Sequence, residues 1–312
     1  RALDRRSVAE MDLGIRLAQV AREMGDRRTL LAALDSHAQE QTSRLRPAVW
    51  LWNTRAVLAT DDALDTAVAR LHDERARRVY VYLMDEAKLL DTRSSRERLT
   101  QFVGLCAQWD IEVFALLGEP EWIAGNNTDA ITRAVKRIKD YNAGLGAFEP
   151  RLAGIKLDLE PHSLPAWEQG GDARAAIESN WLNLLTTARE GLADALPLWA
   201  DLPVKFFHPE EKPLLDRVTE LIDGATLMDY FNAETPITTW ADSSLRVFDE
   251  KPLEIGLELS PRAPAEDSLA AWTPDRVGAL RKTLNETLAA HGNFAGLALH
   301  DYEALTPGTK TE

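Results

Sequence analysis

The stretch LAGIKLDLE, residues 152–160, decides the fold of this chain. Apolar and charged side chains alternate along it, which is the pattern of a β-strand whose two faces meet different surroundings. The apolar face carries Ile155, Leu157 and Leu159, and the charged face carries Lys156, Asp158 and Glu160. We expect the apolar face to pack against helices and the charged face to point into a barrel. Because buried charges are costly unless paired or functional, we expect Lys156 to neutralise Asp158 and Glu160 to reach the mouth.

Seven further short β-rich segments flank this stretch and alternate with amphipathic helical patterns. The segments are residues 48–52, 78–84, 111–117, 196–201, 225–231, 253–259 and 294–299. The helical patterns are residues 63–75, 95–109, 129–141, 173–195, 210–222 and 274–291, while residues 238–250 are only weakly helical. Eight strands joined by helices over about 250 residues predict a (β/α)8 TIM barrel of the α/β class. An open doubly wound sheet would need a glycine-rich turn after its first strand, where WNTR, residues 52–55, stands instead.

The chain divides into two predicted parts. Residues 7–45 carry apolar side chains at helical spacing, with Gly25 and Asp26 as a break between two helices. We therefore predict an N-terminal helical extension over residues 1–46 and the barrel over residues 47–312. The chain begins at Arg1 and shows no signal-peptide core, so we expect any export signal to have been removed already.

The composition is that of an acidic globular protein. Lys and Arg number 36 and Asp and Glu 50 among 312 residues, which gives a formal net charge of −14. This charge disfavours nucleic acids and anionic lipid surfaces as partners. No run of about 18 apolar residues is present, so we expect no membrane insertion. The single Cys106 allows neither an intramolecular disulfide nor a cysteine-based metal cluster.

Acidic, polar and aromatic residues gather at the C-terminal ends of the predicted strands, where a barrel of this type carries its active site. They are Trp52, Asn53, Asp85, Glu119, Trp122, Asp158, Glu160, His162, Asp201, Tyr230, Asn232, Glu258, His300 and Asp301. Carboxylates for chemistry, amides for hydroxyl groups and flat rings for sugar faces are together typical of a carbohydrate site. The alternative for the three charges of residues 152–160 is a structural ion network.

Two other strands direct side chains to the same mouth. Alternation along the seventh predicted strand turns Glu258 inward as a second carboxylate. The alternative is that Glu258 is a hydrogen-bonded partner of Lys156 or His300. On the sixth strand either Tyr230 or Asp229 points inward, and we expect Tyr230 to do so.

Residues 153–160, AGIKLDLE, resemble the strand-four signature Asp-Gly-x-Asp-x-Asp-x-Glu of family 18 glycoside hydrolases, which include chitinases and endo-N-acetylglucosaminidases. Residues 228–230, Met-Asp-Tyr, are similar to the Met-x-Tyr of that family's sixth strand. The resemblance implies that Glu160 is the general acid/base, that Asp158 orients the acetamido group of the substrate, and that Tyr230 helps to hold it. The chain differs from the family pattern at Ala153, Lys156 and His300.

The sequence also resembles a large clan of retaining glycosidases built on the same barrel. These carry an acid/base glutamate in Asn-Glu-Pro on strand four and a nucleophilic glutamate on strand seven, similar to Leu159-Glu160-Pro161 and Glu258 here. Both resemblances imply Glu160 as the acid/base, but only this one makes Glu258 the nucleophile. A retaining pair lies about 5 to 5.5 Å apart and an inverting pair about 6.5 to 9.5 Å, whereas substrate-assisted hydrolysis needs one acid and a neighbouring aspartate. We expect Asp158 to raise the pKa of Glu160 by like-charge repulsion.

A metal site is a further alternative. His162, His208 and His300 fall near predicted strand ends and could bind a metal together with Asp201 or Asp229. No His-x-His or His-x-x-x-His spacing supports this, so we expect no metal and no other cofactor. Three tryptophans are predicted to lie in loops, where they could stack on sugars or pack as hydrophobic residues: Trp122, Trp167 and Trp240.

We therefore predict a glycoside hydrolase that acts on a polysaccharide or other glycan. Its predicted catalytic residues are Glu160, Asp158 and Tyr230, with Glu258 as the alternative nucleophile. The residues expected to contact substrate are Trp52, Asn53, Glu119, Trp122, Lys156, His162, Asp201, Asp229, Asn232 and His300. A carbohydrate-binding barrel without turnover and a scaffolding protein are the alternative functions. The glycosidase interpretation implies a periplasmic or extracellular protein, and the sequence leaves the oligomeric state open.

Overall fold

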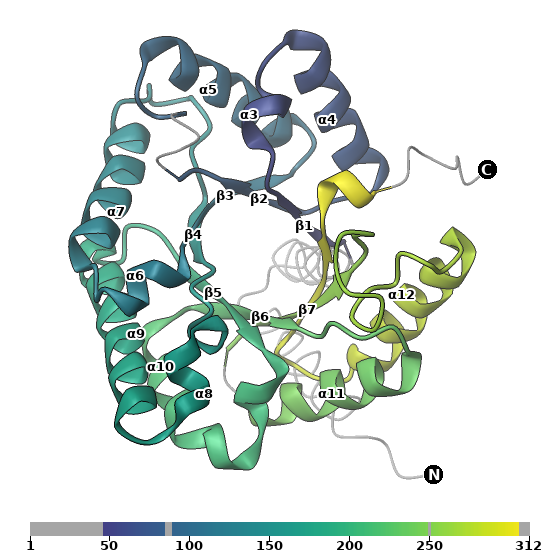
Figure 1. The fold of residues 1–312 in the computed structure, drawn as a ribbon. Coiled ribbons are helices and arrows are strands. Elements are labelled where there is room, and N and C mark those ends of the chain that lie inside the picture. Colours follow the sequence, from purple (N-terminus) through teal and green to yellow (C-terminus); the bar gives the residue numbers. More distant parts are fainter. Residues whose placement is uncertain (1–45, 85–88, 249–250, 306–312) are drawn as a thin grey trace, which may run out of the picture.

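The computed structural model describes residues 46–84, 89–248 and 251–305. Eight parallel strands close into one barrel in chain order, and helices surround the ring of strands (Figure 1). The predicted (β/α)8 barrel is therefore confirmed. Of the predicted N-terminal helical extension, all but Arg46 lies outside the described residues.

The strands form the wall of the barrel, each paired in parallel with the next. They are β1 (Ala48–Leu51), β2 (Arg78–Tyr82), β3 (Glu112–Leu117), β4 (Gly154–Leu157), β5 (Leu198–Pro203), β6 (Gly224–Met228), β7 (Leu253–Glu258) and β8 (Phe294–His300). The barrel closes where Ala48 of β1 pairs with Ala298 of β8. Strands β4 and β6 end earlier than predicted, so Asp158, Glu160 and Tyr230 lie after the last residues of these strands.

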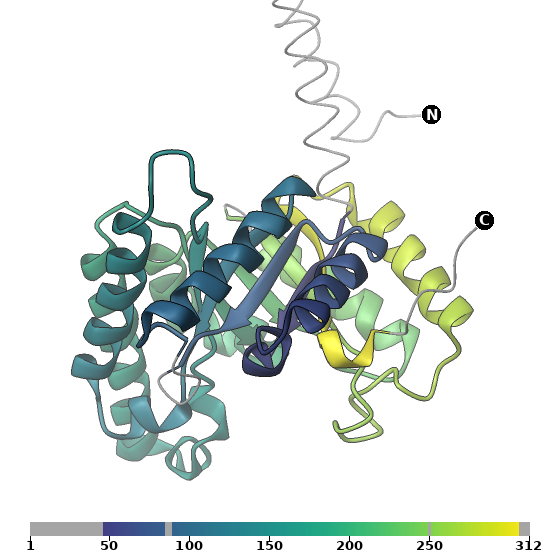
Figure 2. The same cartoon turned by 90° about the horizontal axis from the view of Figure 1, so that it is seen from above.

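Helices cover the outside of this wall, seen from a second direction in Figure 2. They are α3 (Thr54–Val57), α4 (Asp61–Asp73), α5 (Arg93–Gln108), α6 (Pro120–Ala124), α7 (Thr128–Ala143), α8 (Pro165–Gln169), α9 (Gly171–Leu192), α10 (Lys212–Leu221), α11 (Glu234–Val247) and α12 (Pro274–Leu288). The prediction was wrong about residues 238–250, because α11 is a regular helix of 14 residues. Its apolar residues face the barrel at helical spacing, and this burial outweighs the poor helix propensity of its threonines and serines.

Short polar side chains begin several of these helices. Thr60 accepts a hydrogen bond from the Ala63 amide at the start of α4, and Thr92 and Ser95 form a reciprocal capping box at the start of α5. Such caps satisfy amide groups that have no partner inside the helix, and each is worth about 1 kcal/mol. The α4 helix then buries Leu64 and Leu71 on the face that meets the strands.

Two separate cores hold the barrel together. The outer core lies between strands and helices and includes Ile155 and Leu157 of β4. The inner core fills the barrel with aromatic rings, namely Trp50, Tyr80, Phe114 and Trp199. Gly154 admits one of these rings, because a Cβ atom there would lie 2.2 Å from the ring of Phe114. The alternation predicted for β4 is thus realised as one face in each core.

Among residues 46–84, 89–248 and 251–305, no helix combines the length and the apolar character needed to cross a bilayer.

Candidate active site

Glu160 follows β4 in a bend that presents its side chain at the mouth of the barrel. Its backbone is left-handed, with φ 42° and ψ 61°, and Pro161 then begins a short 3₁₀ helix. A non-glycine residue in this conformation is strained, and such strain persists where the surrounding structure imposes it. Within the described residues, the Glu160 carboxyl makes no hydrogen bond or ion pair. It is a half-buried acid that is free to meet a ligand.

Asp158 lies two residues before Glu160 and is held by strand β3. Its amide donates to the Leu117 carbonyl at 2.9 Å. Gly118 follows with φ 135°, and a Cβ atom there would lie 2.3 Å from the Asp158 carbonyl oxygen, so the close approach of the two segments requires glycine. The side chain is less constrained: its buried Oδ1 has no hydrogen-bond partner in the part of the chain that the structure describes.

The environment raises the pKa of both acids. For Asp158, burial raises the pKa well above its ordinary value, and the charges of Asp201 and Glu160 raise it further. For Glu160, burial comes first and the Asp201 charge second, while His300 and Lys205 oppose the rise. Desolvation together with neighbouring carboxylates is the arrangement that keeps a carboxylic acid protonated near neutral pH.

Tyr230 follows β6, which lies two strands along the barrel wall from β4. Its ring centroid lies 5.8 Å from that of His300. Burial raises the pKa of its hydroxyl, and the charges of Asp201, Glu258, Asp158 and Glu160 add to this rise. The phenol therefore lies within electrostatic reach of four carboxylates from β4, β5 and β7, so it points into the mouth. This is the inward orientation that we expected for Tyr230.

Asp229, the neighbour of Tyr230, does not join this group. It is fully buried, and both carboxyl oxygens lack a hydrogen-bond partner among the described residues. Burial alone raises its pKa, well above the ordinary value. Because the side chains of a strand alternate, turning Tyr230 inward turns Asp229 toward the helices. The expected contact between Asp229 and substrate is therefore not retained.

Lys156 pairs with a different carboxylate from the one predicted. Its Nζ lies 2.8 Å from Oδ1 of Asp201 on β5 and donates to Thr226 Oγ1 on β6 at 2.6 Å. The second oxygen of Asp201 accepts a hydrogen bond from Trp50 Nε1 at 3.3 Å. Lys156 and Asp201 are both buried. The expectation that Lys156 neutralises Asp158 was wrong, because the neighbouring strand β5 places Asp201 within ion-pair distance of Lys156. The expected contacts of Lys156 and Asp201 with substrate are not retained.

Glu258 and His300 form a second set of contacts at the mouth. Oε2 of Glu258 lies 2.7 Å from Nδ1 of His300, and Oε1 accepts from the Ser260 amide at 2.6 Å. Nε2 of His300 accepts from Trp52 Nε1 at 2.7 Å. An indole nitrogen only donates, so Nε2 of His300 is the acceptor in this hydrogen bond. With Nε2 occupied, His300 is not a free general base, and Glu258 is the partner of His300 rather than of Lys156.

Some of the other residues predicted to contact substrate lie at the edge of the barrel mouth, and others hold the surrounding loops in place. Glu119 accepts a hydrogen bond from Tyr82 at 2.7 Å, and the Tyr82 ring lies 5.6 Å from Trp52. Asn232 is exposed but donates to the Ala265 carbonyl. Asn53 is also exposed, beginning α3. Glu119 and Trp52 thus flank the acids, while Asn232 serves partly to tie two loops together.

His162 lies on the 3₁₀ turn after Glu160. Burial, followed by the charge of Lys205, lowers its pKa to about 4, so the ring is neutral at ordinary pH. Its Nδ1 has no hydrogen-bond partner among the described residues. Asp85, noted at a predicted strand end, lies outside the described residues.

The three tryptophans predicted in loops have different surroundings. Trp122 lies in α6, packed against the outer core. Trp167 lies in α8 and is buried. Trp240 lies in α11 with its ring 4.7 Å from that of His208. The loop placements were wrong, because each segment forms a helix. Within the described ranges, no group of three or more histidine, cysteine and acidic side chains is placed to hold a metal ion.

The sequence analysis did not identify several residues that contact or influence the site residues from β2 and from the segment after β5. Lys205, on the 3₁₀ helix after β5, is the cation whose charge reaches Glu160. No spacing in the sequence indicates it, because the chain bends between Asp201 and Lys205. Tyr80 and Tyr82 could have been found, since alternation along β2 puts both on the inward face.

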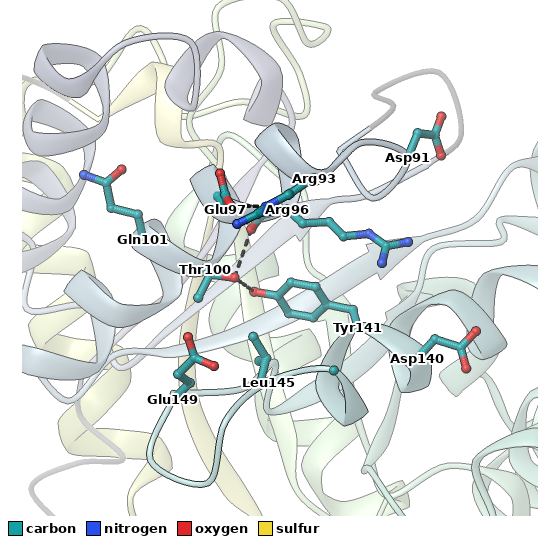
Figure 3. Close-up of a pocket in the computed structure, with 11 residues that line it drawn as sticks. Asp91, Arg93, Arg96, Glu97, Thr100, Gln101, Asp140, Tyr141, Leu145 and Glu149 are labelled. Carbon is teal, nitrogen blue, oxygen red and sulfur yellow. Dashed lines mark hydrogen bonds and ion pairs between the residues drawn. The ribbon is translucent and has the colours of Figure 1, made fainter.

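A hollow of about 690 Å³ lies elsewhere, between α5 and α7 (Figure 3). Thr100 and Tyr141 are hydrogen-bonded across it at 2.9 Å, and Arg93 pairs with Glu97 at 2.7 Å. It lies in the helix layer, away from the strand ends where a barrel of this type acts. We therefore place the candidate site at the mouth.

Comparisons with known proteins support the fold. The sequence matches no protein-family model and no curated protein. A chitinase from Chromobacterium violaceum is similar in structure, with TM-score 0.50 and 13% identity over 83% of this chain and 95% of that one. A β-glycosidase has TM-score 0.52 and 8% identity over 82% and 86% of the two chains. An active-site mutant of the Rhizomucor miehei β-1,3-glucanosyltransferase, in complex with laminaritriose, has TM-score 0.51 and 10% identity over 83% and 86%. These likenesses support the TIM-barrel fold of the chain.

Proposed function

We propose that this protein is a glycoside hydrolase in which Glu160 is the general acid/base and Asp158 and Tyr230 hold the reacting sugar. One observation carries the proposal. Within the described residues, these three side chains approach the mouth from β4 and β6, and none of their polar groups makes a side-chain hydrogen bond or ion pair. Polar groups left without protein partners at the end of a barrel are available to a ligand.

Glu160 supplies the proton that cleavage requires. Its raised pKa supports a protonated side chain at the start of the reaction, and it transfers this proton to the leaving glycosidic oxygen as the bond to the anomeric carbon breaks. The resulting carboxylate then takes a proton from the water that completes hydrolysis. General acid–base catalysis of this kind contributes about 10²- to 10⁴-fold to the rate.

The surroundings of Glu258 favour a substrate-assisted reaction over one with two catalytic carboxylates. Glu258 is 4% exposed, faces His300 and accepts from the Ser260 amide. A nucleophile needs an open path to the anomeric carbon, whereas Glu258 is already occupied. Asp158 is instead the unpartnered carboxyl beside the acid, and we assign it the acetamido group of an N-acetylated sugar.

The rim supports a glycan as substrate. Trp52 and Tyr82 supply rings for the faces of sugars, and Glu119 and Asn53 supply acceptors and donors for hydroxyl groups. We assign His162 and Trp122 to flanking sugars. A periplasmic or extracellular location accompanies this proposal, because polysaccharides are found there.

Product analysis by mass spectrometry tests the proposal. The wild type, Glu160→Gln and the control Glu286→Gln are incubated with N-acetylated, deacetylated and neutral polysaccharides. Glu286 is exposed on α12, away from the mouth. We expect the wild type and the control to cleave an N-acetylated glycan, and Glu160→Gln to bind it without cleavage. If no glycan is cleaved but the wild type and Glu160→Gln bind one equally, the protein is a carbohydrate-binding barrel and the proposal is wrong.

A further inference from the structure

Lys156 is a buried cation directly below the two acids of the site. Its side chain is 0% exposed, so it does not contact substrate. Asp158 and Glu160 follow it on the same face of the chain, two and four residues later. The family 18 pattern has an aspartate at this position, so the present chain carries the opposite charge beneath its acids.

Four groups fix the ammonium in place. Asp201 Oδ1 lies 2.8 Å from Nζ, and Thr226 Oγ1 lies at 2.6 Å. The ring centroids of Tyr80 and Trp50 lie 3.5 and 4.1 Å from it. These contacts come from four different strands, so Lys156 has little freedom to choose another partner.

Asp201 carries the effect of Lys156 to the mouth. Asp201 is the first charge that raises the pKa of both Asp158 and Glu160, after burial. Burial raises the pKa of Asp201 itself, and the charge of Lys156 is the main opposing influence. The ammonium of Lys156 therefore offsets the negative charge that Asp201 presents to the two acids.

We propose that Lys156 is a positioning residue that, through its ion pair with Asp201, sets the net charge beneath Asp158 and Glu160; this inference rests on the proposed function of that site. With the pair intact, the interior adds no net charge below the acids. Loss of the cation leaves Asp201 uncompensated, and loss of Asp201 leaves the cation uncompensated. The two changes act on the acids with opposite sign.

Other charged and titratable groups face this set and are present in every variant. Glu254 on β7 and Tyr80 on β2 face Lys156. The acids also face Glu119, His300, Lys205 and Tyr230, and Glu258 faces Tyr230. Because the carboxyl groups titrate together, the measured midpoints belong to the cluster. Only their direction of change is needed.

The variants are Lys156→Met, Asp201→Asn and the double variant, with Lys212→Met as the matched control. Lys212 forms an exposed pair with Asp216 on α10, so the control removes the same charge from a lysine–aspartate pair far from the mouth. Infrared difference spectroscopy follows the titration of the carboxyl groups in the absence of glycan. The spectrum of Glu160→Gln is subtracted as the reference. The pH profile of kcat/KM is recorded with the cleaved glycan.

We expect Lys156→Met to move the carboxyl midpoint and the alkaline limb of the profile upward by about one pH unit, because an opposite charge is lost. Asp201→Asn moves both downward by a similar amount. The double variant returns near the wild type, and Lys212→Met does not differ from it. Lys156→Arg, which keeps the charge, also stays near the wild-type midpoint.

Equal direction of change in the two single variants, or no change in either, overturns the inference. If Lys156→Met does not fold by circular dichroism, Asp201→Asn alone decides, because an unchanged midpoint contradicts the proposal. The experiment separates this inference from the proposed hydrolase function. Opposite midpoint shifts without any glycan cleavage support the role of Lys156 and reject the hydrolase. Glycan cleavage that depends on Glu160, without the midpoint shifts, supports the hydrolase and rejects the role of Lys156.

Discussion

Strands β4 and β7 carry the same kind of inward charge and use it differently. On β7, Glu254 and Glu258 both have partners: Tyr80, Thr226 and two arginines hold Glu254, and Ser260 and His300 hold Glu258. On the β4 side, only Lys156 has partners. Within the described residues, the carboxyls of Asp158 and Glu160 have none.

The difference separates carboxylates that have charged or hydrogen-bonding partners from carboxyls that have none within the described residues. Burial alone would raise the pKa of Glu254, yet the charges of Arg77, Lys156 and Arg78 hold it below its ordinary value. Burial raises the pKa of Asp158 and Glu160, and neighbouring carboxylates reinforce it. A compensated carboxylate stabilises the folded barrel, whereas uncompensated acids remain able to exchange protons.

The largest effect is expected from replacing the acid on each strand in turn. Glu160→Gln should lower kcat for glycan cleavage by about 10²- to 10⁴-fold, because it removes the proton donor. Glu258→Gln should lower it by only about tenfold, through looser placement of His300. Steady-state kinetics on the cleaved glycan measure both. An equal loss in the two variants would show that the strands are equivalent and restore the two-carboxylate mechanism.

A second contrast concerns stability. Glu254→Gln should lower the free energy of unfolding at neutral pH by about 3–5 kcal/mol, because it leaves Arg77 without its carboxylate and buried Arg78 with Glu112 alone. The folded pKa of Glu254 lies below the unfolded value, so its contribution is present above the unfolded pKa and is lost as pH falls through the folded one. Urea unfolding at several pH values measures the difference between wild type and variant. A difference that does not shrink in acid would contradict the ion-pair explanation.

Asp229 should show the opposite pH dependence. Its folded pKa is raised by burial, so its contribution to stability is full below the unfolded value and is lost as pH rises through the folded value. Asp229→Asn removes this loss and should therefore stabilise the protein relative to wild type at neutral pH, by about 1–3 kcal/mol. Thermal and urea unfolding between acid and neutral pH measure the gain. The exposed Asp65→Asn serves as control, and a gain independent of pH would reject the explanation.

The alternation of residues 152–160 was sufficient to predict which face of β4 enters each core, because side-chain direction along a strand follows from local geometry. For the sixth strand the same rule allowed either Tyr230 or Asp229 to point inward, and we expected Tyr230 to do so. It could not predict the partner of Lys156, because Asp201 and Thr226 come from strands 45 and 70 residues away in the chain. Lys205 and the contact between Glu258 and His300 also depend on how distant segments meet.

By itself, the sequence determined the eight-strand barrel, the inward faces and the acidic, aromatic composition of the mouth, since these follow from periodicity and residue type. The tertiary structure decided which charges have partners. Pairing of the strands along the barrel wall brought β5 and β6 to Lys156 and β8 to Glu258, and within the described residues it left the carboxyls of Asp158 and Glu160 without partners. Periodicity specifies the direction of a side chain, but its pKa depends on desolvation and on charges that only the closed barrel brings within reach.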